Sequence, residues 1–228
     1  MTYNNICEGI FRLRINRFVA EVEINGNIER CHVKNTGRCK ELLVPGARVY
    51  LNQSDKPERS TKYDLITVWK GNRLINMDSQ APNQAFLEYL QLGRYIDGIT
   101  QIKPEAKYGD SRFDFYLETV NNKIFIEVKG VTLEKDNIAL FPDAPTERGI
   151  KHLNELAQSI KHGYEAHVVF IIQMKDIDCF MPNYEIHPEF GAVLSAAHAM
   201  GVKVNALDCI ITPDSMAVGA LVPVKLEG

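Results

Sequence analysis

The stretch RFDFYLETVNNKIFIEVKG, from Arg112 to Gly130, joins two apolar runs by a polar link, VNNK. Asparagine is common in tight turns, so this pattern predicts two β-strands paired as a hairpin. Three charged residues interrupt the apolar runs: Asp114 in the first, and Glu127 and Lys129 in the second. Burying an unpaired charge is costly, so these residues need either a partner or a function.

Side chains alternate between the two faces of a strand, which places Glu127 and Lys129 on the same face of the second strand as Phe125. Gly130 follows them, so both charges are near the carboxyl end of the strand, where α/β sheets open into ligand crevices. The hairpin brings Asp114 alongside Glu127. We therefore expect Asp114, Glu127 and Lys129 to form one cluster.

Two carboxylates in this arrangement are suited to Mg²⁺ or Mn²⁺, because hard cations prefer oxygen ligands. A lysine beside the metal would help a water molecule to attack a phosphate and would offset the negative charge of the transition state. In the alternative interpretation the cluster is structural. Lys129 then forms a salt bridge to one of the acids, and metal has no effect on stability.

The chain from residue 83 to residue 228 alternates helical and strand patterns, which is typical of an α/β domain. Asn83 is a candidate N-cap for a helix over QAFLEYLQLGR, and Thr146 is a candidate N-cap for a second helix in TERGIKHLNELAQSIKHG. The apolar run AHVVFIIQM predicts a strand buried on both faces. A further helix is expected near PEFGAVLSAAHAMG and a further strand in VKVNALDCII.

Residues 1–82 show short alternating runs separated by turns and little sign of helix. The clearest turn is Asn25-Gly26, a strong hairpin signal between alternating runs. Further turns are expected at Pro45-Gly46 and Gly71-Asn72. About five strands in this length predict a small antiparallel barrel of the OB type, although an SH3-like barrel would give a similar pattern.

The composition is that of a globular protein of 228 residues with a net charge of −3. The five cysteines are scattered and form no CxxC pair, which argues against a disulfide scaffold or a cysteine zinc site. We find no signal peptide and no apolar run of about 20 residues, and expect a cytoplasmic protein without membrane contact. Residues 1–80 carry a net +4 and residues 81–228 a net −7, which suits an anion-binding module joined to a cation-binding one.

Two basic segments are candidates for contact with nucleic-acid phosphates. The first is a loop of the expected barrel, where backbone N–H groups and basic side chains can meet a phosphate; the alternative is an ordinary polar turn. The second is the start of the helix that follows Thr146, a natural anion site. The candidate residues of the two segments are Lys34, Asn35, Thr36, Gly37, Arg38, Lys40, Arg148 and Lys151.

Other residues are assigned structural roles. We expect His152 to lie on the solvated face of its helix, although a contact with the acids is the alternative. The aromatic residues Phe18, Tyr50 and Trp69 could stack on bases, as in other OB barrels, but are expected in the core. The other histidines show no spacing typical of a metal site, and no phosphate-binding glycine loop or nucleophilic serine elbow is present.

The order helix, strands, helix, strand, with an acid on one strand and E-x-K on the next, resembles the PD-(D/E)XK nuclease superfamily. The resemblance implies a mixed central sheet, with Asp114 as the first acid, Glu127 as the second and Lys129 as the lysine. Many members carry a further glutamate on the first core helix, for which Glu88 is the candidate metal ligand. The superfamily's proline before the aspartate is replaced here by Phe113.

Motifs along nearly the whole chain resemble the sugar fermentation stimulation protein A (SfsA) family in order and spacing. They are FRLRINRFVAEV, HVKNTGRCKELLVPG, KYGDSRFDF, IEVKGVTL, ALFPDAPTERGIKHLNEL and AHAMGVKV. The resemblance implies an OB-like barrel over residues 1–82, a PD-(D/E)XK nuclease-like domain over residues 83–228, and an association with DNA.

Two hypotheses about function follow from the sequence. In the first, the protein is a Mg²⁺- or Mn²⁺-dependent phosphodiesterase that acts on nucleic acid, with DNA the leading candidate, and a homodimer is expected if it cuts both strands of a duplex. In the second, it is a regulatory protein linked to sugar metabolism, which binds nucleic acid on a nuclease-like fold without turnover. A sugar-metabolising enzyme is a third class, but no residues form a sugar-phosphate or cofactor site.

Overall fold

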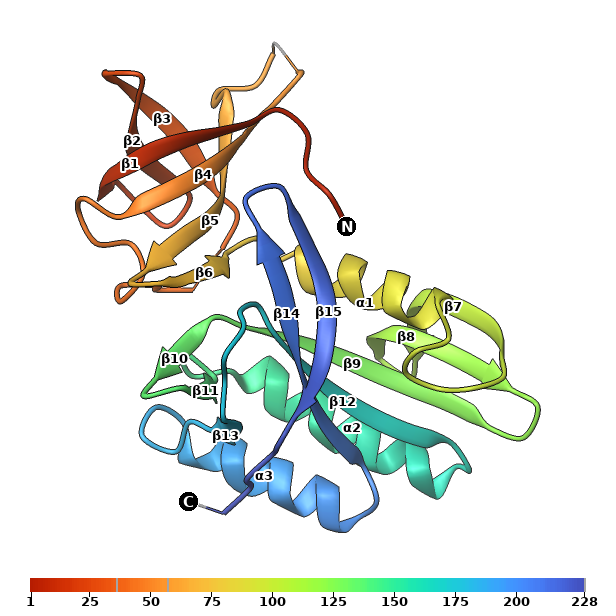
Figure 1. Cartoon of the computed structure of the whole chain (residues 1–228). Helices are drawn as coiled ribbons and strands as arrows, with labels where there is room; N and C mark the ends of the chain where they lie inside the picture. Colours follow the sequence, from red (N-terminus) through yellow and green to blue (C-terminus); the bar gives the residue numbers. More distant parts are fainter. Residues whose placement is uncertain (36, 57, 228) are drawn as a thin grey trace.

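The computed structural model describes residues 1–35, 37–56 and 58–227. The chain forms a β-barrel followed by an α/β domain (Figure 1). The fold class expected from the sequence, an OB barrel joined to an α/β domain with a mixed central sheet, is confirmed. No helix in the described parts is long and apolar enough to cross a membrane.

The barrel is closed by a parallel contact between its third and fifth strands. Its strands pair in the order β3-β2-β1-β4-β5-β6, and the additional β3–β5 pairing joins the edges of the first five. Alternate residues point inward, as in β2, where Ala20, Val22 and Ile24 are buried. The strands are β1 (Ile6–Arg14), β2 (Val19–Ile24), β3 (Asn27–Val33), β4 (Arg48–Gln53), β5 (Tyr63–Lys70) and β6 (Arg73–Asn76).

The α/β domain is built on a six-stranded mixed sheet in the order β15-β14-β12-β9-β8-β7, in which β14, β12 and β9 run parallel. The elements of this sheet and its helices are α1 (Ala81–Gln91), β7 (Ile99–Tyr108), β8 (Ser111–Thr119), β9 (Lys123–Val131), α2 (Glu147–Lys161), β12 (Glu165–Ile172), α3 (Pro188–Ala199), β14 (Lys203–Thr212) and β15 (Ser215–Val222). A second, small sheet contains β10 (Leu133–Lys135), β11 (Ile138–Phe141) and β13 (Cys179–Pro182).

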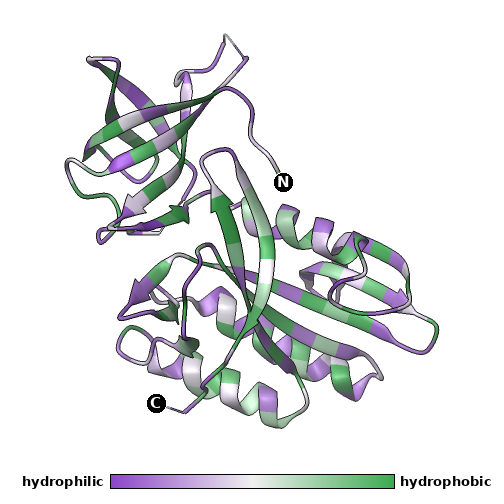
Figure 2. Cartoon of the chain, viewed as in Figure 1, coloured by the Kyte–Doolittle hydropathy of each residue, from purple (hydrophilic) through white to green (hydrophobic). Residues whose placement is uncertain are grey.

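Helices cover both faces of the central sheet, α1 on one side and α2 with α3 on the other (Figure 1). The two faces of β9 therefore have different surroundings: Ile124, Ile126 and Val128 pack with residues of α1, whereas Phe125 packs with residues of α2. Figure 2 shows hydrophobic residues along the strands and hydrophilic residues in many of the turns. Burial of this apolar surface is the main stabilising contribution to the domain.

Several predicted elements are confirmed and others were missed. The β8–β9 hairpin forms, and Thr146 Oγ1 accepts a hydrogen bond from Gly149 N at 3.1 Å as the N-cap of α2. The N-cap predicted at Asn83 is wrong, because α1 begins at Ala81 and the boundary expected after residue 82 falls within its first turn. Strand β7 was missed because its sequence, ITQIKPEAKY, is largely polar and contains Pro104, as is common in edge strands.

The barrel is held against the α/β domain by polar contacts. Asn76 N donates to Gln173 O at 3.0 Å, and the Gln173 side chain donates back to Asn76 O. Lys70 of β5 forms an ion pair of 2.7 Å with Glu134 of β10. These contacts join β5 and the end of β6 to β10 and to the residue that follows β12.

Candidate metal site at the carboxyl end of strand β9

Asp114 lies where β8 separates from β9. The backbone pairing of the two strands runs only as far as Phe115 opposite Ile126. Beyond it, the Asp114 side chain replaces the next backbone acceptor, with Oδ2 accepting from Val128 N at 2.7 Å. Its other oxygen, Oδ1, accepts from Asn83 Nδ2 of α1, also at 2.7 Å.

Glu127 is 3% exposed and is bonded through only one of its oxygens. Oε1 accepts from Lys129 Nζ at 2.5 Å and from His152 Nδ1 in a second close contact. Oε2 is buried and has no hydrogen-bond partner among the described residues. A buried carboxylate oxygen without a partner is costly, so this atom is the strongest sign that the cluster is built to bind a ligand.

The two acids differ in their ionisation. Burial raises the pKa of Asp114 to about 6, the nearby negative charge of Glu127 adds to this, and the hydrogen bond from Val128 N opposes it. Burial would also raise the pKa of Glu127, but the hydrogen bond from His152 and the charge of Lys129 outweigh it and lower that pKa. Glu127 is therefore ionised at neutral pH, while Asp114 gains its proton in mildly acidic solution.

The residues fit a divalent cation as a two-carboxylate site. Asp114 and Glu127 supply oxygen atoms, the ligand type that Mg²⁺ and Mn²⁺ prefer. Glu88, the third ligand implied by the resemblance, is not brought to the cluster, because its Oε2 pairs with the Met1 amine at 2.5 Å. Within the part of the chain that the structure describes, no three His, Cys, Asp or Glu side chains converge in a way that could hold a metal.

The ion pair between Lys129 and Glu127 is the contact that the structural interpretation predicts. That interpretation accounts for Oε1 of Glu127 but not for Oε2. A purely structural cluster would be more stable with both oxygens paired, since an unpartnered buried polar atom costs about 1–3 kcal/mol. Lys129 itself keeps 16% of its side chain exposed and so remains accessible to a ligand.

His152 belongs to the cluster, and its expected position on a solvated helix face is wrong. It is 5% exposed and contacts Glu127 through Nδ1. Arg148, one turn earlier on α2, is exposed and places Nε 3.4 Å from His152 Nε2. Lys151 points to the surface, where it forms an ion pair of 3.8 Å with Glu155.

In the barrel loop predicted to bind phosphate, some residues make structural contacts and others are exposed. Lys34 pairs with the buried Asp78 at 2.5 Å, and the Asn35 side chain accepts from Gly37 N. Arg38 N donates to Asp143 Oδ2 at 3.2 Å, so this N–H faces a carboxylate. The side chains of Arg38 and Lys40 are exposed, while Thr36 lies outside the described residues.

We expect Lys34→Ala to lower the free energy of unfolding by about 3 kcal/mol, because it leaves the 2% exposed Asp78 carboxylate without its cation. Lys40→Ala, on the exposed part of the same loop, should change it by less than about 0.5 kcal/mol. Urea unfolding of both variants measures the difference. Equal stability of the two variants would show that the Lys34–Asp78 pair does not hold the loop.

Arg14 anchors the same loop to the turn between β1 and β2. Its guanidinium donates to the carbonyl oxygens of Arg17, Asn35, Gly37 and Arg38. The result is a surface hollow of about 370 Å³, to which Arg17, Arg38 and Lys40 also contribute. We call this the basic hollow.

Phe18 is 51% exposed in the turn beside the basic hollow, so its expected place in the core is wrong. The alternating pattern of β1 ends at Arg14, and the side chain of Asn16 accepts from Phe18 N at 2.8 Å within a turn. An exposed aromatic ring beside arginines is an arrangement that can stack on an unpaired base.

A smaller pocket of about 150 Å³ connects the barrel loop with the carboxyl end of β9. Its walls include Asn35 and Gly37 of the loop, Gly130 directly after Lys129, and Asp143. Gly37 also lines the basic hollow, so the two hollows are neighbours.

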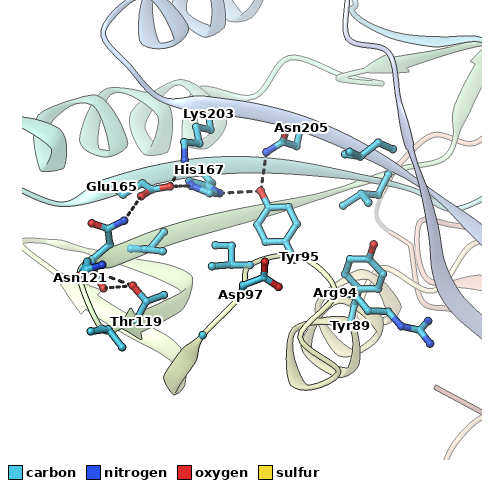
Figure 3. Close-up of a pocket in the computed structure, with 17 residues that line it drawn as sticks. Tyr89, Arg94, Tyr95, Asp97, Thr119, Asn121, Glu165, His167, Lys203 and Asn205 are labelled. Atoms are coloured by element: carbon cyan, nitrogen blue, oxygen red, sulfur yellow. Dashed lines mark hydrogen bonds and ion pairs between the residues drawn. The ribbon is translucent and has the colours of Figure 1, made fainter.

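A further hollow of about 650 Å³ lies at the opposite ends of the parallel strands (Figure 3). Its polar side chains are bonded to one another: Tyr95 OH contacts His167 Nδ1 at 2.8 Å, His167 Nε2 contacts Glu165 at 2.7 Å, and Asn205 donates to Tyr95 OH at 2.7 Å. Burial lowers the pKa of His167, which favours the neutral imidazole. This network is satisfied internally, so we interpret it as structural.

The raised pKa of Asp114 predicts a pH-dependent effect of Asp114→Asn in metal-free protein. Folding opposes ionisation of this carboxyl, so its contribution to stability is full below pH 3.8 and is lost as the pH rises through about 6. Asn83 can rotate its amide to keep the hydrogen bond. The variant should be more stable than the wild type by about 3 kcal/mol at pH 7.5, because the pKa rises from 3.8 to about 6 and a shift of one pKa unit corresponds to about 1.4 kcal/mol.

Urea unfolding in the presence of a chelator, at pH 4.5 and pH 7.5, tests this expectation. The difference between variant and wild type should shrink strongly at the lower pH. A difference that is the same at both pH values would contradict the ionisation behaviour of Asp114.

The fold and the cluster together define a class of protein: a restriction endonuclease-like α/β domain that carries an OB barrel at its N-terminal side. The model of the sugar fermentation stimulation protein RE domain matches residues 80–215, and that of the SfsA N-terminal OB domain matches residues 13–77. The chain belongs to the sugar fermentation stimulation protein (SfsA) family.

Relatives match the chain over nearly its full length. Sugar fermentation stimulation protein homologs are 60% identical in Desulfitobacterium hafniense strain Y51 and 57% identical in Clostridium beijerinckii. The alignment covers 99% of this chain in both cases, and 99% and 100% of the two relatives. The structure of Pyrococcus furiosus SfsA in complex with Ca²⁺ superimposes with a TM-score of 0.89 at 29% identity, covering 99% of this chain and 98% of that one.

Proposed function

We propose that the protein is a Mg²⁺- or Mn²⁺-dependent phosphodiesterase that acts on nucleic acid, with DNA as the first candidate substrate. The observation that carries the proposal is the unpartnered buried Oε2 of Glu127, in a cluster that also contains Asp114 and Lys129. The Ca²⁺ complex of the Pyrococcus relative supports a site for a hard divalent cation in this family.

Each residue of the cluster has a separate role in this proposal. Asp114 and Glu127 hold the metal, which when bound polarises a phosphate oxygen and lowers the pKa of water. Lys129 exchanges its contact with Glu127 for one with the scissile phosphate and so offsets the charge that develops there. Arg148, exposed at the start of α2, contacts a neighbouring phosphate.

The barrel binds the nucleic-acid strand. Arg17, Arg38 and Lys40 present cations at the basic hollow, and Phe18 offers an aromatic face beside them. The pocket lined by Gly37 and Gly130 extends from there to the residue that follows Lys129 in β9. We therefore assign binding chiefly to residues 1–82 and cleavage to residues 83–228.

If the barrel cations contact phosphates, they contribute to the salt dependence of nucleic-acid binding. The double substitution Arg38→Ala and Lys40→Ala should reduce the slope of log affinity against log salt by about 1.4–1.8, since each phosphate contact contributes about 0.7–0.9. Fluorescence anisotropy with a labelled oligonucleotide at several salt concentrations measures the slope. An unchanged slope would place the phosphate contacts elsewhere.

A cleavage assay tests the proposed activity. End-labelled single- and double-stranded DNA and RNA are incubated with the protein and Mg²⁺, Mn²⁺ or a chelator, and binding of each oligonucleotide is measured in parallel. Cutting of at least one substrate that stops with the chelator supports the phosphodiesterase. Binding without cutting under every metal condition rejects it.

The second candidate is a nucleic-acid-binding regulator without turnover, linked to sugar metabolism. The close Lys129–Glu127 pair favours it, because a lysine committed to a carboxylate has no need of a phosphate. In that case Mn²⁺ leaves the melting temperature unchanged. A rise in melting temperature with Mn²⁺ concentration would instead indicate binding to the folded protein.

A further inference from the structure

Two donors, Lys129 and His152, contact the same oxygen of Glu127, Oε1, while Oε2 has no partner among the described residues. His152 Nδ1 contacts Oε1, the same atom that accepts from Lys129 Nζ at 2.5 Å. The imidazole is 5% exposed and packs edge-on against Phe113, with the ring centroids 6.3 Å apart. The ring is therefore enclosed by α2 and β8 and has little freedom to turn.

The contacts with Glu127 and Arg148 agree on which nitrogen of His152 carries the proton. Arg148 Nε is a permanent donor and lies 3.4 Å from His152 Nε2. For Nε2 to accept this hydrogen bond the imidazole must be neutral, with its proton on Nδ1. Nδ1 then donates to Glu127 Oε1, so the hydrogen bonds run in one direction, from Arg148 through His152 to the Glu127 carboxylate, which accepts.

We propose that His152, oriented by Arg148, is a positioning residue that turns Glu127 so that Oε2 faces the metal. This inference rests on the proposed metal site. A carboxylate can turn about its terminal bond, and a flexible donor such as the Lys129 ammonium group can move with it, whereas the enclosed His152 ring cannot. With two donors fixed on Oε1, Oε2 is kept free of competing hydrogen bonds.

Without His152, Lys129 is the remaining donor to Glu127 among the described residues and is free to bridge both carboxylate oxygens. The metal must then displace the ammonium group from Oε2 before it can bind. Groups that orient a metal ligand commonly change metal affinity by about 10- to 100-fold when they are removed. The expected loss with His152→Ala is in this range.

Mn²⁺ affinity, measured by isothermal titration without substrate, tests the proposal. His152→Ala should bind Mn²⁺ about 10- to 100-fold more weakly than the wild type. His152→Asn, whose amide can donate from a position near that of Nδ1, should recover most of the affinity. Arg148→Ala, a change at an exposed position, should weaken binding by a smaller factor of roughly 3 to 10.

His167→Ala is the matched control, because His167 is also a buried histidine bonded to a glutamate but lies at the other end of the sheet. It should lose stability without losing Mn²⁺ affinity. Wild-type affinity in His152→Ala, or an equal loss in His167→Ala, overturns the proposal.

The titration separates this proposal from the proposed function. If the wild type binds Mn²⁺ and His152→Ala binds it weakly, the positioning role stands even when no cleavage is found. If the wild type binds no Mn²⁺, both the metal site and the positioning role fail.

Discussion

Glu127→Gln is expected to lower metal-dependent cleavage by at least about 1,000-fold while leaving nucleic-acid binding within about twofold of the wild type. The substitution keeps the size of the side chain but removes the negative charge that holds the cation. A loss of about 4 kcal/mol of transition-state stabilisation accounts for such a factor, since each 1.4 kcal/mol corresponds to a tenfold change in rate. Single-turnover cleavage with saturating Mn²⁺ measures the effect.

Glu88→Gln is the matched control for this experiment. Glu88 is the carboxylate that the superfamily resemblance assigned to the metal, but it pairs with the Met1 amine instead. Its substitution should leave the cleavage rate within about threefold of the wild type. More than one tenth of the activity remaining in Glu127→Gln, or equal losses in the two variants, would contradict the assignment of the metal ligands.

Lys129→Met is expected to reduce the cleavage rate by about 100- to 1,000-fold without weakening Mn²⁺ binding. Methionine keeps most of the apolar stem, so the change removes the charge that would stabilise the transition state. It also removes the cation that competes with the metal for Glu127, which predicts an unchanged or higher Mn²⁺ affinity. Cleavage rates and calorimetric titration of the same preparation separate the two effects.

Lys175→Met is the control for Lys129→Met, because it also removes a lysine from an ion pair with a carboxylate. Lys175 binds Asp208 of β14 at 2.7 Å, a similar contact in the same sheet but outside the cluster. This variant should cut like the wild type. A parallel loss of Mn²⁺ affinity and cleavage in Lys129→Met would instead show that the lysine holds the site together.

Local signals allowed most of the fold to be predicted. The Asn25-Gly26 turn, the cap at Thr146 and the apolar run of β12 each depend on nearby residues, and all three are found in the structure. Strand β15 was missed because its sequence, SMAVGALV, shows no regular alternation of apolar and polar residues, and its pairing with β14 has no signal in its own sequence.

Predictions for individual side chains succeeded where the partners were close in the sequence. The Glu127–Lys129 pair follows from strand alternation alone, whereas the contact of His152 with Glu127 joins residues 25 positions apart. The spacing of His152 and Leu156, one turn apart on the apolar face, could have revealed the buried position. The pairing of Lys34 with Asp78 spans 44 positions and has no local signal.

The most direct test of the central claim is a crystal structure of the wild-type protein soaked in Mn²⁺, with anomalous diffraction data to locate the metal. The account predicts an anomalous peak within about 2.3 Å of Glu127 Oε2 and of a carboxylate oxygen of Asp114. Mn²⁺ bound only at other sites, with Lys129 bridging both oxygens of Glu127, would contradict the account and identify the cluster as structural.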